Sequence, residues 1–158
     1  MTQRAIVLVT STRAAAGNYQ DRTGPVISDW LSEHGFRVDP VVVVADGPDV
    51  RSALESAVAS RPDLIVTTGG TGVGCDDGTA DATSAVLEKT LPGFSEELRR
   101  RGAESTPFAL MSRGVAGVTG RTFIVNLPGS TGGVRDGLQL LGEVVDHVLD
   151  QLAGGDHG

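Results

Sequence analysis

Cysteine, aromatic residues and basic residues are scarce in this sequence, and each scarcity argues against a class of protein. One cysteine cannot form a disulfide within the chain, which fits a reducing environment. Aromatic residues make up 4% of the sequence, too few to favour a surface that stacks nucleobases. The 13 basic residues against 20 acidic ones give a net charge of −7, which disfavours binding to nucleic acid.

Long apolar runs are lacking as well. No segment is apolar over the length that crosses a bilayer, so we expect no membrane partner. The first residues, Met1 to Arg4, lead at once into a strand-like run, and we expect no secretory signal. Together with the single cysteine, these features predict a cytoplasmic protein.

The composition is that of a globular domain with a sizeable core. Hydrophobic residues make up 39% and charged residues 21% of a chain of 158 residues, which suits one domain. We predict a domain over residues 1–153 and a flexible tail over residues 154–158.

Apolar runs alternate with helical periodicities along the chain. We predict strands over residues 5–10, 38–44, 63–68, 115–118 and 122–127. We predict helices over residues 23–34, 48–58, 94–101 and 130–152, and one from Thr79 through Leu87 toward the break at Pro92. Within this pattern Pro40 indicates an edge strand or an irregular start, Thr79 a helix cap, and Pro92 with Gly93 a break. The alternation predicts an α/β fold, a mostly parallel sheet flanked by helices on both faces.

The segments that follow the predicted strands are polar or rich in glycine. They are residues 10–13, 45–47, 67–72 and 126–130. Because ligands bind beyond the carboxyl ends of strands in open α/β sheets, we expect these four segments to converge on one edge.

The loop after the third strand has the composition of an anion site. Gly69, Gly70 and Gly72 allow backbone N–H groups to approach a ligand without a Cβ in the way. Thr68 and Thr71 add hydroxyl groups, and a predicted helix follows with its positive end toward the loop.

Two aspartates follow the glycines of this loop. Asp76 and Asp77 would repel a phosphate unless a cation lay between, and a carboxylate beside a phosphate cradle suits Mg²⁺ with a nucleotide. A plain strand-to-helix turn, with aspartates that compensate the helix dipole, also fits the pattern. A P-loop does not fit, because the only lysine, Lys89, lies inside a predicted helix, and the glycines do not match a dinucleotide fingerprint either.

Other reactive side chains show no arrangement typical of catalysis. Cys75 has no histidine beside it in the sequence, so we interpret it as incidental. The histidines, His34, His147 and His157, favour solvated or capping roles over metal binding. Residues 99–101, three arginines, indicate a solvated helix end. Arg113 is a candidate phosphate partner or a surface residue.

Four segments resemble the MoaB/Mog family of molybdenum cofactor biosynthesis, which includes the G domain of gephyrin. They are "DRTGP" at residues 21–25, "TTGGTG" at 67–72, "TPFALMSRGVAG" at 106–117 and "NLPGS" at 126–130. The resemblance implies a Rossmann-like molybdopterin-binding fold that assembles as a trimer or hexamer. It implies adenylylation of molybdopterin by ATP and Mg²⁺, which prepares the pterin for a molybdate-inserting partner protein.

The resemblance also assigns roles to individual residues. Asp77 and Asp46 match the acidic residues of catalysis and of the nucleotide–metal site. The matching substrate and nucleotide contacts are Ser11, Thr68, Gly69, Gly70, Thr71, Gly72, Ser112, Pro128, Gly129 and Ser130.

The chain departs from the family pattern near these residues. The family commonly has Arg-Asp-Val-Thr-Pro where residues 76–80 read Asp-Asp-Gly-Thr-Ala, so an arginine is replaced by Asp76. Residues 131 and 132, Thr and Gly, replace the usual Pro and its following Lys or Asn. Besides an adenylyltransferase, the sequence therefore fits a non-catalytic molybdopterin-binding paralogue and, more distantly, an unrelated nucleotide-binding module.

Overall fold

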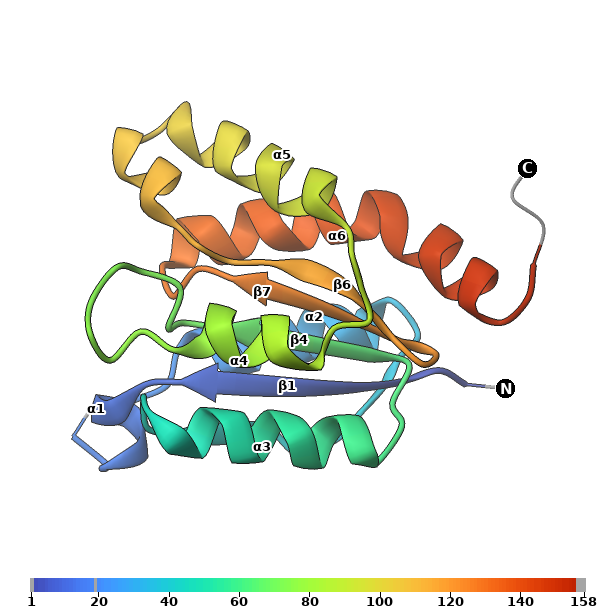
Figure 1. Cartoon of the computed structure of the whole chain (residues 1–158), viewed down its shortest axis with the longest axis horizontal. Coiled ribbons are helices and arrows are strands. Elements are labelled where there is room, and N and C mark those ends of the chain that lie inside the picture. Colours follow the sequence, from blue (N-terminus) through green and yellow to red (C-terminus); the bar gives the residue numbers. More distant parts are fainter. Residues whose placement is uncertain (1, 19, 156–158) are drawn as a thin grey trace.

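The apolar runs of the sequence form the strands of one sheet, and the amphipathic segments form helices that cover it (Figure 1). The computed structural model describes residues 2–18 and 20–155. Its strands are β1 (Arg4–Thr10), β2 (Arg37–Val38), β3 (Val42–Val44), β4 (Leu64–Thr68), β5 (Lys89–Thr90), β6 (Ala116–Thr119) and β7 (Thr122–Leu127). Its helices are α1 (Thr12–Ala15), α2 (Thr23–Glu33), α3 (Pro48–Ala59), α4 (Thr79–Val86), α5 (Pro92–Ala103), the 3₁₀ helix η1 (Pro107–Met111) and α6 (Thr131–Leu152).

The sheet is mostly parallel, as predicted. The strand order is β2-β1-β4-β7-β6-β5, and β3 also pairs with β1. Strands β2, β3, β4 and β7 lie in one parallel set with β1, whereas β6 is antiparallel to both β7 and β5. Strand β6 is antiparallel to β7 because a tight hairpin joins the two strands. Gly120 forms this turn with a positive φ of 56°.

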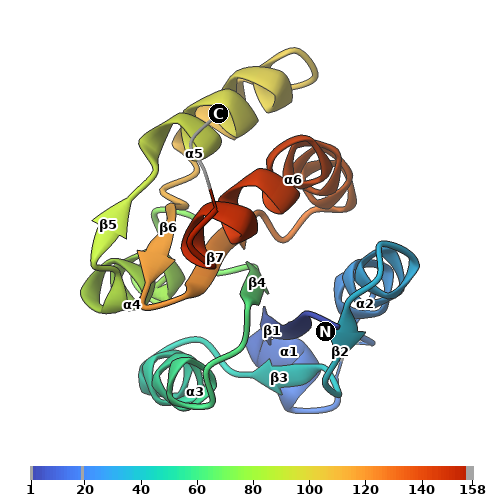
Figure 2. The same cartoon turned by 90° about the vertical axis from the view of Figure 1, so that its right-hand side faces the viewer.

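Helices cover both faces of the sheet, which confirms the second part of the predicted fold (Figure 2). Helices α2, α5 and α6 pack on one face, where Phe94 and Phe123 meet edge to face at 6.2 Å between ring centroids. Helices α3 and α4 pack on the other face, where Leu54 lies among the buried side chains of β1, β4 and β7. The two cores follow from the alternation of side chains along each strand, since Ile65 and Leu64 belong to opposite faces.

The carboxyl ends of the parallel strands meet at one edge, on the left of Figure 1. The register aligns Thr10 with Val44, and Thr68 with Leu127. The predicted convergence of the four loops is therefore confirmed, and the loops after β1, β3, β4 and β7 lie together at this edge.

The strand predicted over residues 38–44 is wrong as one buried element. It forms two short strands, β2 and β3, because Pro40 has no N–H to donate to a ladder. Asp39, just before it, turns instead to Arg4, with 2.6 Å between the nearest oxygen and nitrogen. Both strands pair only with β1 at the border of the sheet, so the irregular edge indicated by Pro40 is confirmed.

Two predicted helix boundaries are also wrong. Gly78, not Thr79, occupies the cap position of α4, and Thr79, the first residue of the helix, donates its hydroxyl to the Thr10 hydroxyl at 3.1 Å. Helix α5 begins at Pro92 rather than after it, since proline at the first helical position loses no helical hydrogen bond. Lys89, predicted inside a helix, lies in β5.

The sequence did not predict α1, β5 and η1, which have too few residues to show a period. Helix α6 matches its prediction, and Ser130 caps it by accepting a hydrogen bond from the Gly133 amide at 3.1 Å. Gly154 and Gly155 follow α6, and the rest of the predicted tail, residues 156–158, lies outside the described residues. The boundary of the domain and its tail stays a prediction.

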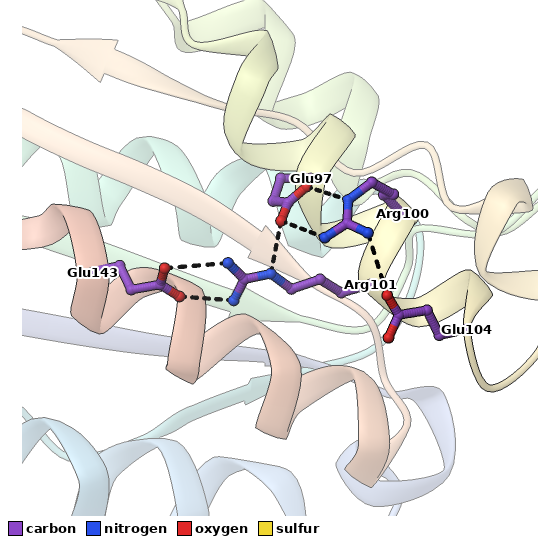
Figure 3. A network of polar contacts seen from close by, with 5 residues as sticks. All are labelled: Glu97, Arg100, Arg101, Glu104 and Glu143. Carbon is purple, nitrogen blue, oxygen red and sulfur yellow. Dashed lines mark hydrogen bonds and ion pairs between the residues drawn. The ribbon is translucent and has the colours of Figure 1, made fainter.

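A network of ion pairs joins α5 to α6 (Figure 3). Glu97 accepts from Arg100 at 2.6 Å and from Arg101 at 2.9 Å, and Arg101 continues to Glu143 at 2.7 Å. The hydrogen bonds from Arg100 and then Arg101 lower the pKa of Glu97 to about 2. Arg100 and Arg101 therefore lie at the end of α5, as predicted, and pair there with acidic side chains.

We expect this network to make stability depend on pH. Glu97 has a folded-state pKa below its ordinary value of 4.5, so its contribution is complete above that value and is lost as the pH falls toward about 2. Glu97→Gln should therefore lower the urea midpoint at neutral pH, and the difference from the parent should shrink as the pH falls below about 4.5. Glu96→Gln, an exposed neighbour, is the control and should show no such convergence.

Candidate functional site

The glycine loop after β4 is joined closely to the loop after β7. Gly69 donates its amide to the Leu127 carbonyl at 3.1 Å, and the Thr68 hydroxyl donates to the Pro128 carbonyl at 2.8 Å. A Cβ placed on Gly129 would lie 3.4 Å from the Gly69 Cα, so the two loops touch through their backbones. The Gly69 amide and the Thr68 hydroxyl therefore hold the loop after β4 against the loop after β7. This joins two of the four segments that were predicted to converge.

The same loop is joined to the end of β1 and the start of α4. Gly70 has a φ of 68° and accepts a hydrogen bond from the Thr79 amide at 3.1 Å. A Cβ on Gly70 would overlap the Thr79 hydroxyl, and that hydroxyl donates to Thr10. Only glycine fits at this position without strain, because φ is positive and the Thr79 side chain is close.

A cavity of about 450 Å³ opens beside these loops. Five residues predicted as substrate or nucleotide contacts lie in its wall: Thr71, Gly72, Ser112, Pro128 and Ser130. They come from three segments that are far apart in the sequence and that each carry a motif of the resemblance. The other predicted contacts, Ser11, Thr68, Gly69, Gly70 and Gly129, lie outside the wall of this cavity.

The opposite wall of the cavity comes from elements whose role the sequence did not indicate. Leu98 and Arg99 of α5 line it together with Phe108 and Met111 of η1. The Arg99 guanidinium donates to the carbonyls of Ser112 and Gly114 at 3.2 and 3.1 Å, so it supports the wall instead of ending in solvent. The sequence signal for η1 is Thr106 followed by Pro107, because that threonine caps the helix through the Phe108 amide.

Asn126, the last polar residue of β7, holds the floor of the cavity. Its side chain is 1% exposed and donates to the Thr67 hydroxyl at 2.8 Å and to the Thr83 hydroxyl at 3.0 Å. Its side-chain oxygen accepts from the Val115 amide at 3.1 Å. One side chain therefore ties together β4, α4 and the start of β6 under the cavity.

Asp46 lies at the exit of β3 beside the exit of β1. Its amide and its Oδ2 atom both bond the Thr12 hydroxyl at 3.1 Å, and Ser11 caps α1 through the Ala14 amide at 3.2 Å. The other carboxylate oxygen of Asp46, Oδ1, is buried and has no hydrogen-bond partner. A buried oxygen of this kind is costly unless a ligand or a cation satisfies it.

Asp77 lies in the far part of the glycine loop. Its Oδ2 atom accepts from the Gly74 amide at 2.9 Å, and its own amide donates to the Gly74 carbonyl at 3.1 Å. The carboxylate closes a turn within the loop and does not line the cavity. Residues 73–76 form the exposed tip of the loop, and Cys75 is exposed within it.

Neither the histidines nor the acidic side chains of the described residues form a ready-made metal cluster. Among residues 2–18 and 20–155 no group of three or more His, Cys, Asp or Glu side chains is close enough to hold a metal ion. His34 stacks on Trp30 and bonds its carbonyl at 2.7 Å, while exposed His147 contacts Gln151. His157 lies outside the described residues. Across the described part of the chain, no helix combines the length and the apolar character that a membrane span needs.

Comparison with known proteins shows that this chain is similar to proteins of molybdenum cofactor biosynthesis. A family model described as "Probable molybdopterin binding domain" matches residues 6–147. A molybdopterin adenylyltransferase of Helicobacter pylori is 36% identical over 154 residues, which cover 94% of this chain and 86% of that protein. A molybdenum cofactor biosynthesis bifunctional protein of Synechococcus elongatus is 36% identical over 155 residues, 98% of this chain but 49% of that protein. The chain thus spans about half the length of this bifunctional relative.

Solved structures agree with this relationship. The Mog protein of Mycobacterium ulcerans superposes with a TM-score of 0.91 at 50% identity, covering 95% of this chain and 99% of that chain. The tungsten cofactor synthesizing protein MoaB of Pyrococcus furiosus superposes with a TM-score of 0.87 at 30% identity, covering 96% and 97%. The names of these relatives agree with the predicted function in molybdenum cofactor biosynthesis and with the predicted adenylyltransferase activity. The chain belongs to the MoaB/Mog family of molybdopterin-binding domains.

Proposed function

We propose that this chain binds molybdopterin and transfers to it the adenylyl group of ATP, with release of pyrophosphate. The observation that carries this proposal is the cavity in which Thr71, Ser112 and Ser130 meet. Its volume of about 450 Å³ lies within the range of about 300–1,000 Å³ that is usual for small-molecule sites. Names of relatives such as the Helicobacter pylori adenylyltransferase support the choice of substrates.

The cavity suits a ligand that has an apolar body and an anionic end. Leu98, Phe108 and Met111 supply apolar surface for a ring system. Helix α6 begins at the opposite side, where Gly132 and Arg135 line the cavity near the positive end of the helix. A pterin that carries a phosphate has this combination of a ring and an anion.

The transfer requires two anions to be held in line. An oxygen of the pterin phosphate attacks the α-phosphorus of ATP, the bond from that phosphorus to the β-phosphate oxygen breaks, and pyrophosphate leaves with the electron pair. No protein nucleophile takes part, so the exposed Cys75 has no role in the step. The contribution of the chain is to orient the two phosphates through the glycine loop and the amino end of α6.

Mg²⁺ would be held by Asp46 and Asp77 together with the phosphates of the nucleotide. The donor set fits the ion, because Mg²⁺ in such sites takes one or two carboxylates and substrate oxygens, and the buried Oδ1 of Asp46 has no other partner. When bound, the ion would neutralise the charge that develops on the transferred phosphoryl group.

A second candidate function is molybdopterin binding without transfer. It is favoured by the turn in which Asp77 accepts from Gly74, since this carboxylate points into its own loop rather than into the cavity. Asp76, where the family has arginine, adds a negative charge beside it.

The assembly and the cellular location are further parts of the proposal. The family resemblance supports a trimer or hexamer, and the single cysteine supports a cytoplasmic location. An exposed apolar side chain such as Leu110, 62% exposed and outside the cavity wall, would be covered by an interface between subunits. A protein that inserts molybdate would take over the adenylylated pterin.

The test is a turnover assay combined with a variant that fills the cavity. The parent protein, mixed with molybdopterin, ATP and Mg²⁺, should form adenylylated pterin and pyrophosphate, and chelation of Mg²⁺ should stop the reaction. Gly132→Trp should raise KM for molybdopterin about 10-fold or more, because Gly132 lines the cavity and nothing within 4 Å would resist a side chain there.

Gly93→Trp is the matched control for this variant. Gly93 is also the second residue of its helix and also has open space around it, but it does not line the cavity. Its KM should stay near that of the parent. Equal kinetics for both variants would show that the pterin binds elsewhere, and binding without product in the parent would favour the second candidate function.

A further inference from the structure

We propose that Arg113 is a positioning residue for the adenylyl transfer, because its guanidinium fixes both ends of the loop tip that leads to Asp77. The proposal rests on the proposed function above. It departs from the two roles that the sequence left open for Arg113, a phosphate partner and a surface residue.

The backbone of Arg113 joins the cavity wall to the glycine loop. The residue directly follows Ser112, and its amide donates to the Thr71 carbonyl at 2.7 Å. This hydrogen bond fixes the backbone of Arg113 next to the glycine loop, so its side chain can reach the loop tip.

The guanidinium bonds the loop at two places. Nε donates to the Gly72 carbonyl at 2.9 Å, and Nη2 donates to the Asp77 carbonyl at 2.7 Å. These two carbonyls lie on either side of residues 73–76, the exposed tip. One planar group thus sets the separation between the two ends of the tip. A lysine ammonium has a single nitrogen and cannot hold two carbonyls at this fixed separation.

A carboxylate on α4 also contacts the guanidinium. Asp81 accepts from Nη1 at 3.2 and 3.3 Å and from Nη2 at 3.3 Å. The Asp81 side chain is 72% exposed, so the ion pair contributes little energy of its own. The two half-buried hydrogen bonds to the Gly72 and Asp77 carbonyls are therefore the ones that restrain the loop.

This arrangement determines where the Asp77 carboxylate lies. Arg113 holds the Asp77 carbonyl, while the Asp77 side chain and amide both bond Gly74 inside the tip. If the carbonyls at the two ends moved apart, the turn that carries the carboxylate would open. Arg113 does not line the cavity, and each of its side-chain nitrogens already has an acceptor, so a direct phosphate contact is not its role.

The decisive comparison is between Arg113→Lys and Asp81→Asn. Arg113→Lys should lower kcat about 10-fold or more, with KM for molybdopterin and for ATP near the parent values, because a displaced reacting group slows the step without removing a substrate contact. Asp81→Asn removes only the ion pair and should keep kcat within about two-fold of the parent. Arg113→Ala should regain activity on addition of guanidinium ion and not of ethylammonium ion.

Hydrogen exchange of the loop gives a readout that does not need turnover. The amides of Gly74 and Asp77 should exchange about 10-fold faster in Arg113→Lys than in the parent or in Asp81→Asn, while exchange in β4 stays unchanged. Parent-like loop exchange, an unchanged kcat, or a loss confined to KM would each overturn the proposal. A parent without turnover would refute the adenylyl transfer, and with it the link to catalysis, whereas the exchange data would still decide whether Arg113 holds the loop.

Discussion

Replacement of Asp77 by asparagine is expected to lower kcat for adenylyl transfer by about 100- to 1,000-fold, the usual cost of removing one preorganised charged or polar group that stabilises a transition state. The amide has nearly the shape of the carboxylate, and its oxygen can still accept from the Gly74 amide. The loop should therefore keep its turn while the carboxylate charge that would help to hold Mg²⁺ at the reacting phosphates is lost. The measurement is steady-state formation of adenylylated pterin at saturating ATP and Mg²⁺.

Asp76→Asn is the matched control, because it removes the same charge one residue earlier. Asp76 is exposed at the tip of the loop, whereas Asp77 is half-buried and bonded to Gly74. We expect kcat of this variant to equal or exceed that of the parent, since Asp76 repels the anionic substrates. Similar losses in both variants would show that only the total charge of the loop matters, and full activity of Asp77→Asn would remove Asp77 from the mechanism.

The outcome also separates the two candidate functions. A catalytic member should lose turnover in Asp77→Asn and still bind molybdopterin, because Asp77 does not line the cavity. A member that only binds should show no product in the parent and unchanged affinity in the variant. Titration of molybdopterin into both proteins, in parallel with the turnover assay, therefore distinguishes them.

The sequence was most informative where one physical pattern dominated. The strands at β1, β4 and β7 were predictable because each contains a continuous apolar run, and a fully buried parallel strand requires such a run. The convergence of their loops followed from the fold class alone. Helix α6 was predictable from its long apolar stripe.

The rest depended on contacts that leave no pattern in the sequence. The wall made by η1 was missed because a helix of this length has no detectable period. Thr79 suits a helix cap by its chemistry, but it lies one residue inside α4, where its hydroxyl donates to Thr10 of β1. The contacts of Arg113 could not be predicted, because two of its acceptors are backbone carbonyls, which every residue has.

Replacement of Asn126 by leucine is expected to lower the free energy of unfolding by about 3 kcal/mol, because three buried hydrogen bonds of about 1 kcal/mol each are lost together. The Asn126 side chain is 1% exposed, so water cannot take over its contacts to Thr67, Thr83 and Val115. For a domain of this size the melting temperature should fall by about 6–12 °C. Urea and thermal unfolding of the purified variant check both values.

Thr122→Val is the control for this prediction, since Thr122 is equally buried in β7 but makes one side-chain hydrogen bond, to the Pro62 carbonyl at 2.6 Å. It should lower stability by about 1 kcal/mol. Equal losses of unfolding free energy in the two variants would mean that the three hydrogen bonds of Asn126 together stabilise the fold no more than the single bond of Thr122. A loss that scales with the number of bonds would show that the floor of the cavity is held by polar contacts within the core. The cavity at the edge of the sheet would then depend on the same residue that stabilises the packing of β4, α4 and β6 beneath it.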